Sequence, residues 1–221
     1  MVMIDLAMKA AKRLYYDAFL APRGYGRPVP KSTWDAQYKD GVWDRVYSVH
    51  EVAHYMVAVG YVQHLLKSPK VLDAGCGPGY LLQLLNAFSL ETYLGIDLSS
   101  EAVEKAKSRG IKNARFKVAD FEQWTPEENF DVVIFNESLS YARRPVDVLV
   151  RYAGLLDEDG FLIVSLCRYG NHGIIWKNLE EHFAMLDSTT VENSRGQVWD
   201  IRVVQKRPVA PLHTLDTGSP V

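Results

Sequence analysis

Short apolar runs alternate with segments of helical periodicity from about residue 70 onward. Apolar runs of about four to eight residues are typical of strands that are buried on both faces of a sheet. We predict strands at residues 71–72, 93–98, 116–121, 130–137 and 161–166, and helices from Tyr80 onward and at 99–109, 145–156 and 174–183. A turn is expected at 157–160. Two last strands, 185–192 and 198–206, flank turn residues 193–196, whose composition is typical of a hairpin.

This order of elements predicts the fold class. Strands that alternate with helices are typical of an α/β fold. We therefore expect a doubly wound, mostly parallel sheet of seven strands that ends in an antiparallel hairpin. Ligands of such sheets bind beyond the carboxyl ends of the strands.

The segment before this alternation is predicted to be a helical cap or lid. The expected division is a cap at 1–67, a core at 68–206 and a tail at 207–221, within one structural domain. One face of an N-terminal helix would carry Ile4, Met8, Ala11, Tyr15, Ala18 and Phe19. That face predicts packing on the domain or on a second copy of the chain, which would form a homodimer. The alternative is contact with a membrane surface.

Two further helices are predicted in the cap. After a loop at 21–31, Ser32 or Thr33 is expected to cap a short helix, and a longer helix is expected at 49–66. The short helix is rich in tryptophan and tyrosine, which predicts either core packing or a lid. Aromatic faces attract cations, so such a lid would suit a positively charged ligand.

Composition narrows the class of protein. The chain has 221 residues, 48% of them hydrophobic, which is enough for one domain with a full core. Its net charge of −2 supplies no general attraction to nucleic acid. Two cysteines make no disulfide framework, so we expect a reducing, cytoplasmic location. Neither a transmembrane segment nor a signal peptide is expected, because apolar runs are short and Lys9, Lys12 and Arg13 interrupt the N-terminal segment.

Candidate chemistry begins in Lys70 to Leu85, KVLDAGCGPGYLLQLL, where a strand, a glycine-rich turn and a helix follow one another. Glycines allow positive φ and close approach of a ligand, and the helix N-terminus faces that ligand. A dinucleotide fingerprint needs glycines at offsets of zero, two and five. Gly75, Gly77 and Gly79 stand at zero, two and four, which disfavours NAD. A P-loop is excluded because Tyr80, and no Lys-Ser/Thr pair, follows the last glycine.

An acidic residue lies at the end of each of the next two predicted strands. Asp97 ends the second strand, 24 residues after Asp73 (97 − 73). A carboxylate in this place of a nucleotide-binding sheet accepts hydrogen bonds from the two hydroxyls of a ribose. Ser99 is expected to cap the following helix, which Gly110 ends. Asp120 is the acid of the third strand.

Two segments carry a resemblance to a known family. Residues 73–79, DAGCGPG, resemble the E/DxGxGxG signature of class I (Rossmann-like) S-adenosylmethionine (SAM)-dependent methyltransferases, and GIDLSSEAVEKA resembles that family's second signature. A third pattern comprises Trp34-Asp35, Tyr38, Trp43-Asp44, Glu51 and His54-Tyr55. It is similar to the N-terminal region of bacterial small-molecule and glycan methyltransferases, where this region covers the SAM site. The resemblance extends over residues 34–206.

The resemblance implies SAM as the cofactor and S-adenosylhomocysteine (SAH) as its product. It implies that Asp120 binds the adenine amino group, and that the backbone of Phe121 meets a ring nitrogen. Tyr38 and His54 are implied near the methionine carboxylate. The complete set implied for the cofactor is Asp73, Gly75, Cys76, Gly77, Gly79, Asp97, Leu98, Asp120, Phe121, Asn136, Tyr38 and His54.

A general base is needed only when the acceptor must lose a proton. His172 is our first candidate because it follows the fifth strand at the active edge, and Glu137 is the second. His50 and His54 are further candidates, and Glu137 has substrate binding as its alternative role. We expect no metal, because acidic residues after the fourth and fifth strands are too few. No nucleic-acid substrate is expected, since Asn136 to Leu139 lack a DPPY-like motif.

The resulting hypothesis is a SAM-dependent methyltransferase that moves a methyl group to a hydroxyl or amine of a small molecule or glycan by in-line displacement. Two alternatives remain open at this point. One is a non-catalytic binding protein with the same fold, and the other is an NAD-dependent oxidoreductase.

Overall fold

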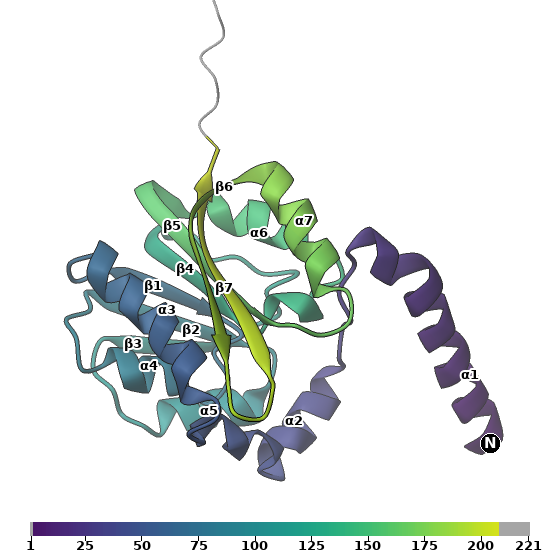
Figure 1. The fold of residues 1–221 in the computed structure, drawn as a ribbon. Coiled ribbons are helices and arrows are strands. Elements are labelled where there is room, and N and C mark those ends of the chain that lie inside the picture. The colour runs from purple at the N-terminus through teal and green to yellow at the C-terminus, as the bar shows by residue number, and fades with distance from the viewer. Residues whose placement is uncertain (1, 208–221) are drawn as a thin grey trace, which may run out of the picture.

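A computed structural model describes residues 2–207 of the chain (Figure 1). Seven strands form one sheet in the order β3-β2-β1-β4-β5-β7-β6. Their bounds are β1 (Lys70–Ala74), β2 (Thr92–Asp97), β3 (Ala114–Val118), β4 (Phe130–Asn136), β5 (Leu156–Cys167), β6 (Phe183–Glu192) and β7 (Val198–Lys206). Strands β1 to β5 pair in parallel, and β7 pairs antiparallel with both β5 and β6. The predicted doubly wound fold with a terminal hairpin is confirmed.

Helices lie on both faces of the sheet, and others precede it (Figure 1). Their bounds are α1 (Val2–Tyr15), α2 (Lys31–Lys39), α3 (Val52–Leu65), α4 (Tyr80–Leu85), α5 (Ser100–Lys107), α6 (Pro145–Ala153) and α7 (His172–His182). Short helical turns occupy Tyr16–Leu20, Ala21–Arg23, Val42–Tyr47 and Leu139–Tyr141.

Successive residues of the central strands belong to two different cores. Leu72 of β1 and Val133 of β4 lie in a core with residues of α6 and α7. Val71 and Val132, their chain neighbours, lie in a second core with residues of α3 and α4. Because side chains alternate across a strand, a strand covered on both faces reads as a continuous apolar run. This double burial explains why the strands were predictable.

Several predicted boundaries are wrong: the helix expected at 145–156, for example, ends at Ala153, and Leu156 begins β5. β3 ends at Val118, because Asp120 closes a turn in which its Oδ1 accepts a hydrogen bond from the Glu122 amide at 2.8 Å. The expected turn at 157–160 is an irregularity inside β5: Phe130 pairs with Leu156, but Val132 pairs with Phe161. Neither Ser32 nor Thr33 caps α2, which begins at Lys31 after Pro30.

Helix α1 projects away from the sheet and its flanking helices (Figure 1). Met8, Leu14, Tyr15 and Phe19 are all more than half exposed. The interpretation that this helix packs on the domain is therefore wrong for α1, and contact with a second copy or a membrane surface stays a prediction. Among residues 2–207, the structure contains no helix that is both long and apolar enough to span a membrane.

The double-sided core yields a prediction about stability. Leu72→Ala removes a fully buried side chain from β1 and should lower the free energy of unfolding by ~2–5 kcal/mol. Val150→Ala on α6 alters a side chain that is 47% exposed. It should change the free energy of unfolding by less than ~0.5 kcal/mol. Urea unfolding measures both values. Equal effects of the two substitutions would contradict the assignment of Leu72 to the core.

Candidate active site

The turn after β1 brings backbone atoms to the sheet edge at three positions that carry no side chain of their own. Gly75, Gly77 and Gly79 have φ values of 85°, 53° and 75°, a region that favours glycine. The amides of Gly75 and Cys76 both donate to the carbonyl of Ile96 on β2, at 2.8 and 2.9 Å. A Cβ at Gly75 would lie 2.3 Å from the Ser138 Cβ, so glycine is required there by space as well as by φ.

Asp97 connects this turn to the next βα unit. Its Oδ2 accepts a hydrogen bond from the Gly77 amide at 2.9 Å, and its Oδ1 accepts one from the Ser99 amide at 2.8 Å. Burial raises the pKa of Asp97 to about 6. Ser99 caps α5 as predicted, because its side chain accepts from the Ala102 amide. The carboxylate is thus held at the carboxyl end of β2, where it borders a cavity over the sheet edge.

A cavity of about 1460 Å³ lies over this edge of the sheet. Every residue predicted to bind the cofactor or act in catalysis lines it, except Asp73, Gly79 and His50. Asp73 lies beneath the turn, where it accepts a hydrogen bond from the hydroxyl of Tyr93. Gly79 precedes α4 as its N-cap. The cavity is larger than the ~300–1,000 Å³ typical of a pocket for one small molecule.

Aromatic side chains from the cap form one wall of the cavity. Trp34 meets Tyr141 edge to face, with ring centroids 4.8 Å apart, and lies 5.5 Å from Trp43. The hydroxyl of Tyr38 lies over the turn, 3.1 Å from the position a Cβ at Gly77 would take. Burial raises the pKa of Tyr38, so its phenol is neutral. The aromatic segment predicted to be core or lid therefore borders the cavity.

Polar groups with free hydrogen-bonding capacity gather at the end of β4. Both amide atoms of Asn136 are buried without a partner among the described side chains and backbone groups, as is Nδ1 of His54. His54 stacks on Trp199 at 4.6 Å, and its Nε2 lies 3.2 Å from Oε2 of Glu51. Unsatisfied buried groups are costly, so a ligand that bonds them would be favoured here.

Glu137 occupies a constrained position beside this cluster. Its φ of 57° is rare for a residue with a Cβ. Its carboxylate oxygens accept from the hydroxyl of Ser165 at 2.7 Å and the amide of Cys167 at 3.0 Å. Burial raises the pKa of Glu137. Two of its acceptor sites are therefore engaged within the protein.

His172 begins helix α7 and lines the same cavity. Its Nδ1 lies against the carbonyl oxygen of Cys167, which accepts a hydrogen bond only if Nδ1 carries the proton. Nε2 is then the nitrogen with the free lone pair. Burial lowers the pKa of His172, which favours this neutral form. His50, another candidate base, instead lies beside Ser194 of the final hairpin and does not line the cavity.

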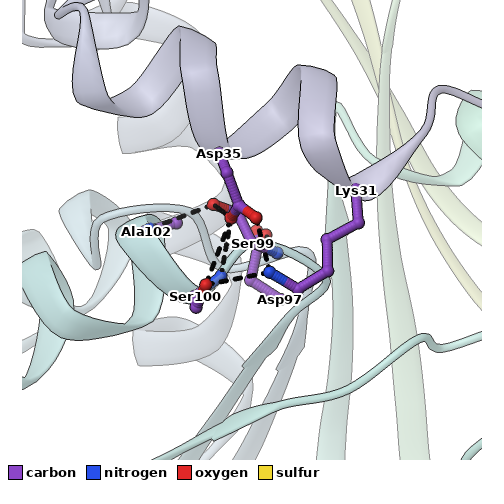
Figure 2. A network of polar contacts seen from close by, with 6 residues as sticks. All are labelled: Lys31, Asp35, Asp97, Ser99, Ser100 and Ala102. Carbon is purple, nitrogen blue, oxygen red and sulfur yellow. Dashed lines mark hydrogen bonds and ion pairs between the residues drawn. The ribbon is translucent and has the colours of Figure 1, made fainter.

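Sequence reasoning missed several residues that line or support the site. Trp199 comes from β7, and no local motif marks it. Asp35 was quoted only as part of a pattern, although it contacts α5 (Figure 2). Tyr141 follows β4 and joins the aromatic wall. Among the side chains that the structure describes, which exclude those of residues 2–7 and 9, no group of three or more His, Cys, Asp or Glu could hold a metal ion.

Known proteins share sequence similarity with this chain. A family model described as a methyltransferase domain matches residues 65–211. A trans-aconitate 2-methyltransferase from Methylobacterium radiotolerans is 34% identical over 103 residues, which are 46% of this chain and 39% of that protein. A malonyl-[acyl-carrier protein] O-methyltransferase from Bacillus anthracis is 33% identical over 100 residues, 44% of this chain and 37% of that protein. The chain therefore matches less than two fifths of the length of either relative.

Solved structures share the fold. The N-methyltransferase NodS from Bradyrhizobium japonicum, crystallised with SAH, superposes with a TM-score of 0.68 at 14% identity and covers 80% of this chain and 98% of NodS. The [4+2]-cyclase SpnF superposes with a TM-score of 0.66 at 16% identity and covers 84% of this chain and all of SpnF. At such identities the likeness concerns the fold alone.

The buried carboxyl of Asp73 leads to a pH-dependent prediction. Burial raises its pKa to about 7, against an ordinary value of 3.8. Because the folded state holds the proton more tightly, this contribution to stability is complete below about pH 4 and is lost as the pH rises to 7. Asp73→Asn cannot titrate. The unfolding free energy of the wild type relative to this variant should therefore fall between pH 4.5 and 7.5, by up to ~4 kcal/mol. Urea unfolding at both pH values measures the difference, and a constant difference would contradict the raised pKa.

Proposed function

Because the chain belongs to the methyltransferase-domain family, we propose that its cavity binds SAM and that the protein transfers the methyl group to a small-molecule acceptor. One observation carries this proposal. The glycine turn, Asp97 and Asp120, which lie far apart in the sequence, line a single cavity at the carboxyl edge of the sheet. The size of this cavity supports two ligands, the cofactor and an acceptor.

Each part of the cofactor has residues that suit it. The carboxylate of Asp97 accepts hydrogen bonds from the ribose hydroxyls. Asp120 and the backbone of Phe121 bind the adenine ring, and Leu98 lines the same cavity. Phe121 is held in place edge to face on Phe135, with centroids 5.8 Å apart.

The methionine end lies against Gly75 to Gly77 in this proposal. The amides of these three residues already donate to Ile96 and Asp97, so the turn contributes close approach to its backbone and supplies no free N–H donor. Tyr38 and His54 approach this end from the cap, and the unpartnered amide of Asn136 is available to the amino group. These contacts would give partners to His54 and Asn136, whose buried polar atoms have none within the described part of the chain.

SAM, when bound, supplies a methyl group activated by a positively charged sulfur. The aromatic wall of Trp34, Tyr38 and Tyr141 suits that charge. An acceptor oxygen or nitrogen forms a bond to the methyl carbon while the carbon–sulfur bond breaks, and the bonding electrons leave with sulfur. The protein contributes mainly alignment of the two reactants, which is worth up to ~7–11 kcal/mol.

His172 takes the proton released by the acceptor in this proposal. Its free nitrogen is Nε2, and its lowered pKa keeps that nitrogen unprotonated at neutral pH. Glu137 is the weaker candidate, because Ser165 and Cys167 already engage its oxygens. Its hydrogen bonds suit it better to holding the carboxyl end of β4 against that of β5.

We favour oxygen as the acceptor atom, because one relative is named an O-methyltransferase. A glycan hydroxyl remains within this class, and an amine is the alternative.

A homodimer through α1 and a cytoplasmic location are further parts of the proposal. Both cysteines are free thiols, in keeping with a reducing compartment.

The competing function is a binding protein or enzyme of the same fold that transfers no methyl group. SpnF, which shares the fold, is described as a cyclase. Isothermal titration with SAM, SAH and NADH, followed by a screen for acceptors that release SAH from SAM, tests the choice. Failure to bind SAM or SAH would overturn the proposal. Binding without turnover on any acceptor would favour the competing function.

Asp97 should control cofactor affinity in a pH-dependent way. Its carboxylate must be ionised to accept from both ribose hydroxyls, and its pKa is about 6. Wild-type affinity for SAH should therefore fall by up to ~10-fold per pH unit below 6. Asp97→Asn should bind ~10–100-fold more weakly at pH 7.5 and lose this dependence. Calorimetry measures the affinities, with Glu104→Gln on the exposed face of α5 as the control. Wild-type affinity in a folded Asp97→Asn variant would remove Asp97 from the ribose site.

His172 should affect turnover more than binding. His172→Ala should lower kcat by ~10²–10⁴-fold while its SAH affinity stays close to that of the wild type. His182→Ala, at the exposed far end of α7, is the matched control. Rates are measured as SAH released with an acceptor from the screen above. Unchanged turnover in His172→Ala would exclude its role as the base.

A further inference from the structure

Helix α2 carries part of the aromatic wall, yet it has no buried residue. The 3-10 turn that follows it, Val42–Tyr47, has none either. Helices are normally held by an apolar face packed on the core. Contacts of another kind must therefore contribute to holding Trp34 and Tyr38 over the cavity.

One such contact is a polar cluster between α2 and the N-terminal end of α5 (Figure 2). Oδ1 of Asp35 accepts from the hydroxyl of Ser99 at 2.7 Å, and from the amide and hydroxyl of Ser100 at 3.0 and 3.3 Å. Lys31 donates both to Oδ2 of Asp35 and to the Ser100 hydroxyl. A carboxylate at this end of a helix also interacts favourably with the helix dipole.

The cluster is joined to the candidate ribose site through a single residue. The amide of Ser99 donates to Asp97, while the hydroxyl of the same Ser99 donates to Asp35. That hydroxyl also accepts from the Ala102 amide, so its proton is directed toward Asp35. The two polar groups of one serine thus contact both Asp97, which the Gly77 amide also holds, and Asp35 of α2.

The other contacts of α2 face the cavity or the far end of α5. Lys105 donates to the backbone carbonyl of Tyr38 and lies 3.9 Å from Asp44. Trp34 and Tyr38 contact aromatic rings that themselves line the cavity. Asp35 is distinct because its carboxylate joins the helix directly to Ser99, which donates a hydrogen bond to Asp97.

We propose that Asp35 is a positioning residue that latches α2 onto α5, and so couples closure of the aromatic wall to occupation of the Asp97 site. This inference rests on the proposed function, since the ligand in question is SAM or SAH. Coupling of this kind is reciprocal. A ligand held by Asp97 orders Ser99 and strengthens the latch, and a closed latch slows escape of the ligand.

The latch should appear as a kinetic effect. Asp35→Ala should raise the dissociation rate of SAH at least about tenfold, with a smaller change in the association rate, because affinity changes within one site fall mainly on dissociation. Ser100→Ala keeps the carboxylate but removes one donor, and should give an intermediate rate. Stopped-flow fluorescence with Trp34 and Trp43 as reporters measures these rates. Asp40→Ala, an exposed acid that flanks the same helix, should match the wild type.

Hydrogen exchange on the ligand-free protein separates this inference from the proposed function. Asp35→Ala should accelerate exchange of amides in 31–39 while leaving those of β1 and β4 protected. Asp40→Ala should leave exchange in all three segments as in the wild type. A wild type that binds SAH, with Asp35→Ala unchanged in both dissociation and exchange, would overturn the latch and leave the proposed function standing. A wild type that binds no SAH would overturn the proposed function, and the exchange result would still decide on the latch.

Discussion

The hydrogen bonds from the Gly75 and Cys76 amides to Ile96 hold the rest of the site in place. They fix the turn after β1 to the end of β2, which is possible only because the backbone takes positive φ at successive glycines. With the turn fixed, the Gly77 amide points at Asp97, and Asp97 in turn holds Ser99 at the start of α5. Two βα units thus present one continuous polar edge.

This edge is stable because the sheet behind it is apolar on both faces. Parallel strands covered by helices have their carboxyl ends at the same side, so residues distant in the sequence meet there. The cost is that polar groups such as Asp73 and Asn136 are buried with incomplete hydrogen bonding among the described residues. Such groups are unfavourable in a core and useful at a site that receives a polar ligand.

The cap is built on a different principle. Its helix α2 adds aromatic surface to the cavity but is attached by hydrogen bonds, ion pairs and ring contacts at its margins. Attachments of this kind are weaker than a packed core and open more readily. In the proposed methyltransferase, the rigid sheet edge would hold the cofactor, and the less firmly held wall above it would allow two ligands to enter and leave.

The sequence by itself determined the strands, the glycine turn and the acids that follow β2 and β3, because local periodicity and backbone chemistry encode them. It misplaced the end of β3 and the irregularity in β5, where side-chain hydrogen bonds and strand pairing override local patterns. Only the tertiary structure decided that Asp73 lies beneath the turn and that His172 enters the cavity while His50 does not. It also revealed Trp199 and the contact of Asp35 with Ser99. These depend on segments many residues apart, whose approach is set by packing of the whole sheet and is written in no local spacing.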